Sequence, residues 1–78
     1  MMTHLRGDIA LAGAELADVV RRQVRAGRDA RATDREIRYT ALHDCYTTLA
    51  VEFPPGPERD GRWQRYCATL DAALRGDA

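Results

Sequence analysis

The sequence contains no lysine, no asparagine and no serine, so arginine supplies all twelve of its basic side chains. Lysine and asparagine codons are A-rich, whereas most arginine and alanine codons are G/C-rich. The bias therefore indicates a GC-rich genome, such as that of a bacterium or a bacterial phage. Codon supply then explains much of the arginine content without any selection for guanidinium chemistry.

What the chain lacks also excludes several classes of protein. Its formal net charge is zero, which argues against a polyanion-binding surface over the whole molecule. No apolar run approaches the ~18 residues that span a membrane, and residues 1–6 show no secretory signal. We therefore expect a cytoplasmic protein that does not associate with membranes, and whose two cysteines are reduced.

The 78 residues are predicted to form one helical domain, residues 1–78, with a thin core. Domains of this size gain stability from disulfides, a bound metal or oligomerisation. Two cysteines make no disulfide framework, and no metal-ligand spacing is present. We therefore expect no cofactor and predict a homodimer.

Three helices are predicted, at about residues 3–26, 34–53 and 58–75. No alternating run of β-branched or aromatic residues favours strands, so the predicted fold class is all-α. The tight turn Pro54–Pro57 makes the second and third helices antiparallel neighbours. The long N-terminal helix then covers this hairpin, which gives a small three-helix bundle.

Local signals set the expected helix ends. Gly27 is the expected C-terminal cap of the first helix, and Gly76 that of the third. Thr33 and Glu36 have the spacing of a capping box at the start of the second helix. Pro57 suits the first turn of the third helix.

Helical periodicity assigns one stripe of each hairpin helix to the core. The two stripes are Tyr39, Leu42, Cys45, Tyr46, Leu49 and Phe53 in the second helix, and Trp63, Tyr66, Cys67, Leu70, Ala73 and Leu74 in the third. Other apolar residues fall outside the main stripes, and three helices alone do not explain them. Leu11, Ile37 and Val51 are therefore predicted to bind a partner protein or a second copy.

Arginines concentrate around the first predicted linker. Seven arginines and three acidic residues lie between Arg21 and Arg38, a local charge of plus four. The hypothesis is an anion- or partner-binding basic corner made of Arg21, Arg25, Arg28, Arg31, Arg35 and Arg38. The alternative is codon bias combined with capping of the negative end of the helix dipole.

His43, Cys45 and Cys67 are the only residues that suggest nucleophilic or metal chemistry. On a helix His43 and Cys45 point about 200° apart, so they cannot form a catalytic pair. Cys45 and Cys67 fall at matching heights in the hairpin. A disulfide there is geometrically allowed, but two buried reduced thiols are the preferred interpretation.

These patterns predict a small non-enzymatic protein that acts by protein–protein interaction, as an adaptor, a regulator or a phage-type inhibitor of a host system. The alternative is a nucleic-acid-binding regulator that uses the basic corner Arg21–Arg38. An enzyme is a third hypothesis, but no catalytic constellation in the sequence supports it.

Overall fold

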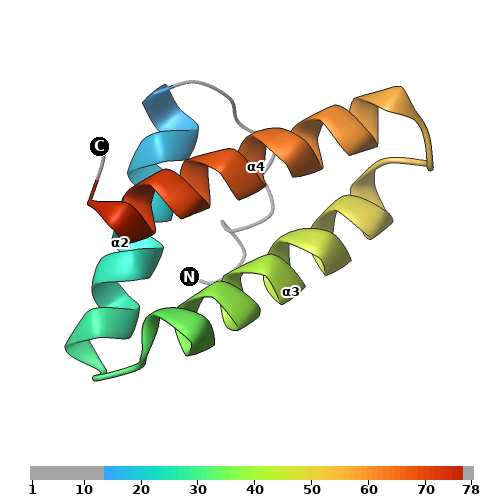
Figure 1. Cartoon of the computed structure of the whole chain (residues 1–78). Helices are drawn as coiled ribbons and strands as arrows, with labels where there is room; N and C mark the ends of the chain where they lie inside the picture. The colour runs from blue at the N-terminus through green and yellow to red at the C-terminus, as the bar shows by residue number, and fades with distance from the viewer. Residues whose placement is uncertain (1–13, 77–78) are drawn as a thin grey trace.

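The computed structural model describes residues 14–76, which contain the helices α2 (Ala14–Asp29), α3 (Asp34–Glu52) and α4 (Pro57–Arg75). These residues include no strand, and the three helices pack against one another (Figure 1). The predicted all-α class is therefore confirmed. Leu11 and the first part of the predicted N-terminal helix lie outside the described residues.

The helices α3 and α4 run in opposite directions, and α2 crosses them where α3 begins and α4 ends (Figure 1). All three pairs of helices are in contact, and α2 contacts α4 more extensively than it contacts α3. A polar contact within the core also joins α2 to α4. The hydroxyl of the buried Tyr66 donates a hydrogen bond to Gln23 Oε1 at 2.6 Å.

Gly27 does not end α2, so the predicted C-terminal cap is wrong. The helix continues to Asp29, and its end is closed by hydrogen bonds from Ala32 N to Gly27 O and from Arg31 N to Arg28 O, both 2.9 Å. This pattern is a Schellman motif, with Arg31 in the left-handed region at φ 64°. Gly27 is needed for packing instead, since a Cβ there would lie 2.5 Å from Cγ1 of Ile37.

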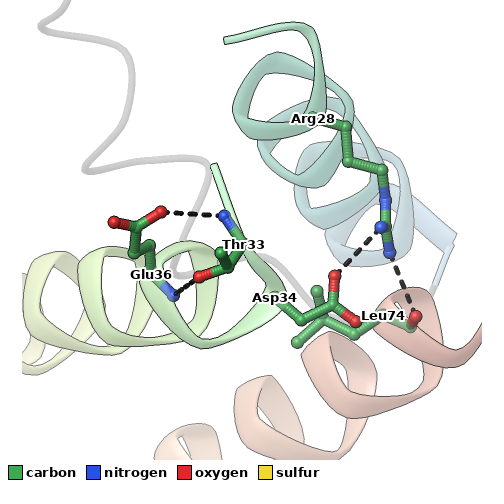
Figure 2. Close-up of polar contacts among 5 residues, drawn as sticks. All are labelled: Arg28, Thr33, Asp34, Glu36 and Leu74. Atoms are coloured by element: carbon green, nitrogen blue, oxygen red, sulfur yellow. Dashed lines mark hydrogen bonds and ion pairs between the residues drawn. The ribbon is translucent and has the colours of Figure 1, made fainter. Parts of the chain in front are cut away.

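The capping box at the start of α3 is confirmed. Thr33 Oγ1 accepts from the Glu36 N–H at 3.1 Å, and Glu36 Oε1 accepts from the Thr33 N–H at 2.8 Å (Figure 2). The expected signals of α4 are also present, with Pro57 in its first turn and Gly76 in the left-handed conformation at its C-terminal cap. These local interactions satisfy helix-end groups that have no partner within the helix.

The predicted core stripe of α3 is confirmed in part, because Cys45 and Leu49 are buried and Leu42 and Phe53 pack against the core. Tyr39 and Tyr46, expected in the core, are 73% and 57% exposed. The buried residues of α3 recur at every fourth position, and Ile37 and Ala41 are the two that the predicted stripe did not contain. The close approach of Ile37 to Gly27 explains the difference, because a glycine in α2 admits an aliphatic side chain of α3 at that contact. On α4, Tyr66 and Leu70 are buried, as predicted.

Candidate functional interface

The exposed aromatic residues of α3 lie along one line of the helix, which we call the outer strip. It consists of Arg35, Tyr39, Leu42, His43 and Tyr46, together with Trp63 of α4. Spacings of four and three residues bring its α3 members to one side of that helix. A hollow of about 480 Å³ lies on the strip, lined by Arg35, Arg38, Tyr39, Leu42, His43 and Tyr46.

Ring contacts order the aromatic side chains of the strip. Tyr39 and His43 stack with their ring centroids 6.3 Å apart and an interplanar angle of 22°. Tyr46 meets Trp63 edge to face, with centroids 5.8 Å apart and an angle of 82°. Such contacts restrict side-chain rotation before any partner binds, so a partner loses less conformational entropy on docking.

One end of the outer strip is basic, and the hollow at the other end is lined by one acidic and one basic side chain. At the end nearest the start of α3, no described residue forms a hydrogen bond or an ion pair with the Arg35 guanidinium. At the other end, Asp60 lines a smaller hollow with Tyr46, Leu49, Arg59 and Trp63. The Asp60 carboxylate likewise has no partner within the described residues, whereas Arg59 donates to the carbonyl oxygen of Phe53 at 3.3 Å.

Three arginines of the predicted basic corner are engaged within the chain. Arg28 donates from Nη1 to Asp34 Oδ1 at 2.9 Å and from Nη2 to the carbonyl oxygen of Leu74 at 3.1 Å, so one guanidinium joins α2, α3 and α4 (Figure 2). Arg21 pairs with Asp18 on α2. These contacts give structural reasons for guanidinium groups at Arg21 and Arg28.

Arg38 is the third engaged arginine, and it links α3 to α4. Its Nε donates to Asp71 Oδ1 at 3.0 Å. The hydrogen bond and the negative charge of Asp71 raise the pKa of Arg38, so the guanidinium stays protonated. Arg38 therefore lines the hollow on the outer strip while being held from the side of α4.

Arg25, Arg31 and Arg35 are exposed, and no described residue is a hydrogen-bond or ion-pair partner of their guanidinium groups. Arg25 shares a hollow of about 340 Å³ with Arg21 and Arg28, but Asp29 also lines it. Half of the predicted basic corner thus remains available for an anion, and it is spread over α2, the following turn and the start of α3.

The three predicted apolar partner-binding residues are placed very differently. Ile37 is 5% exposed and belongs to the core, where it packs beside Gly27. Val51 is 67% exposed, but helical geometry puts it about 140° around α3 from Tyr46, away from the outer strip. Leu11 lies outside the described residues. The three residues therefore do not form one surface within the described part of the chain.

The thiols and His43 are also separated, as the helical spacing predicted. His43 is exposed, whereas Cys45 is buried, and both cysteines are free thiols. Burial and the neighbouring Cys67 raise the pKa of Cys45 to about 12, so its thiol is protonated at neutral pH. Burial and the charge of Asp71 also raise the pKa of Cys67. The thiolate that nucleophilic or metal chemistry requires is disfavoured at both positions.

A further hollow, of about 410 Å³, lies between α2 and α3. It is lined mainly by apolar atoms, and its residues include Gln23, Ala26, Gly27, Ile37, Thr40 and Ala41. Residues 14–76 contain no group of three or more histidine, cysteine, aspartate or glutamate side chains placed to hold a metal ion. None of the described helices has the length and apolar character that crossing a membrane requires.

The chain matches no family model, no curated protein and no solved structure. The candidate interface therefore depends on its own geometry. The sequence pattern groups Tyr39, Leu42 and Tyr46 in one core stripe, but only Leu42 packs against the core, and the two tyrosines are exposed. A signal that pointed outward was the flanking charge, because Arg35 continues the same stripe by one helical step of four residues.

Proposed function

We propose that this chain is a small non-enzymatic protein that acts by protein–protein interaction, as an adaptor or a regulator, and that the outer strip is its binding surface. The main observation is that Tyr39 and Tyr46 stand exposed two helical turns apart, with Leu42 between them. Tyrosine, tryptophan and arginine are the residues enriched at energetically important interface positions. A strip spaced by four and three residues fits a partner helix.

Affinity capture from the source cell tests the proposal, with the full chain as bait. With both Tyr39→Ala and Tyr46→Ala, the amount of a specifically captured protein should fall at least about tenfold. The reason is that hot-spot aromatic residues contribute about 2 kcal/mol or more each to binding. The matched control carries Thr40→Ala and Thr48→Ala, two positions that lie more than 100° around α3 from Tyr46. If the two tyrosine substitutions leave the set of captured proteins unchanged, the outer strip is not the binding surface.

A nucleic-acid ligand is the second candidate, supported by the partnerless guanidinium groups of Arg25, Arg31 and Arg35 among the described residues. Phosphate contacts release counterions, so the affinity for DNA or RNA would fall steeply as salt is added. Arg25→Glu would weaken binding to every nucleic-acid sequence by a similar factor. Binding that does not change between low and physiological salt argues against this candidate.

A further inference from the structure

The outer strip is arranged so that it matches a copy of itself. If two α3 helices lie antiparallel with a two-fold axis midway between Leu42 and His43, Tyr39 of each copy meets Tyr46 of the other. Leu42 and His43 then face each other across the axis. The stacked Tyr39–His43 pair and the Tyr46–Trp63 pair thus form the two halves of a repeated aromatic contact. A two-fold interface uses the same patch on both subunits, which is the property this strip has.

Arg35 and Asp60, near the two ends of the strip, are also placed so that the same two-fold axis brings them together. Arg35 lies seven to eight residues from the axis, a distance of roughly 11 Å along an α-helix. On the other side, Asp60 shares a hollow with Tyr46 and Leu49, which lie roughly 5–10 Å from the axis. The two-fold operation therefore brings the Arg35 guanidinium of each copy towards the Asp60 carboxylate of the other. Neither group has a partner within the described residues.

We propose that the occupant of the outer strip is a second copy of this chain, with α3 antiparallel to α3, Tyr39 against Tyr46, and Arg35 paired with Asp60. The inference rests on the proposed function, because it names the partner of the same surface. The mirrored cation and anion favour self-association over an acidic partner, which would need only the cation. Two such ion pairs fix the direction of the helices, since a parallel arrangement brings like charges together.

Charge exchange tests this arrangement through the dimer dissociation constant, measured by light scattering or analytical ultracentrifugation of the full chain. Arg35→Glu and Asp60→Arg are each expected to weaken the dimer by about tenfold or more, because each creates two like-charge contacts. The double variant R35E/D60R should recover to within about threefold of the unmodified protein. A mixture of the two single variants should form a heterodimer, in which both ion pairs are of opposite charge.

The location of the axis has its own measurement. His43→Cys places a thiol beside the two-fold axis, and a short thiol-specific cross-linker should join two copies efficiently. Val51→Cys is the control, because this exposed position lies about 140° around α3 from Tyr46 and further along the helix from the axis. Cys45 and Cys67 are present in both proteins, so their reactivity cancels in the comparison. Equal cross-linking of the two variants overturns the proposed axis.

A protein that stays monomeric at high micromolar concentration overturns self-docking outright. A dimer whose dissociation constant is unchanged by the charge exchanges overturns it too, because that dimer uses another face. Neither result removes the proposed function if Tyr39→Ala and Tyr46→Ala still abolish capture of a different protein, since the strip then binds a heterologous helix. If the chain is monomeric and the tyrosine changes leave capture unaffected, both proposals fail.

Discussion

The two faces of α3 differ in side-chain size more than in apolar character. The inner face presents Ile37, Ala41, Cys45 and Leu49 at every fourth position, and all four are buried. The outer face presents larger rings, and Tyr39 and Tyr46 are mostly exposed. The inner residues are small or aliphatic, and Ile37 sits where α2 has a glycine. At this contact the glycine lets the backbone of α2 approach the side chain of Ile37 closely.

The largest change in stability is expected from truncating one side chain on each face of α3 and comparing the two variants. Leu49→Ala should lower the free energy of unfolding by about 2–5 kcal/mol, because it removes a buried side chain and leaves a cavity. Tyr39→Ala should change it by less than about 0.5 kcal/mol, since that ring is mainly in solvent. Urea denaturation followed by circular dichroism measures both at low protein concentration. Equal losses at the two positions contradict the assignment of inner and outer faces.

Helix existence and most helix ends were predictable because their causes are local. The capping box at Thr33 and Glu36, the Pro54–Pro57 turn and the cap at Gly76 each depend on neighbours within a few residues. The buried face of α3 was not predictable in this way. Two stripes of similar apolar content run along the helix, and which residues are buried depends on the residues of α2 and α4 that stand opposite.

The basic corner shows the same limit for the candidate site. Charge counting placed Arg28 in it, but one acceptor of Arg28 is the carbonyl oxygen of Leu74, which is 46 residues away in sequence. A backbone acceptor leaves no residue-type signal, so no pattern in the sequence reveals this contact. Arg38 likewise pairs with Asp71 of α4 once the two helices pack together. The arginines that stay available for a partner become identifiable only after these internal contacts are known.

A smaller change in stability is expected at Gly27, and its contact with Ile37 is tested by comparing two glycines that lie within helices. Gly27→Ala introduces a Cβ 2.5 Å from Cγ1 of Ile37, an overpacking that costs about 1–3 kcal/mol. The better helix propensity of alanine returns about 0.5–1 kcal/mol, so a net loss on the order of 1 kcal/mol is expected. Gly61→Ala is the control, because a Cβ there meets nothing within 4 Å, and it should gain about 0.5–1 kcal/mol.

The double variant with Gly27→Ala and Ile37→Ala separates steric conflict from other causes. Ile37→Ala removes the Cγ1 atom that conflicts with the new Cβ, so the combined loss should be smaller than the sum of the two single losses. Strictly additive losses would show that Gly27 does not select the inner face through its contact with Ile37. Thermal or urea unfolding of the unmodified protein, the two single variants and the double variant gives the four free energies of this double-mutant cycle.

The smallest expected effect concerns the turn between α2 and α3. Arg31 holds a left-handed conformation at φ 64°, which disfavours a residue with a Cβ by about 1–2 kcal/mol. Arg31→Gly relieves this strain but also frees the unfolded chain, so a net gain of about 0.5 kcal/mol in the free energy of unfolding is expected. Arg22→Gly, at an exposed position inside α2, should instead lose about 1 kcal/mol. If both variants lose stability equally, the Schellman turn does not hold Arg31 in this conformation in solution.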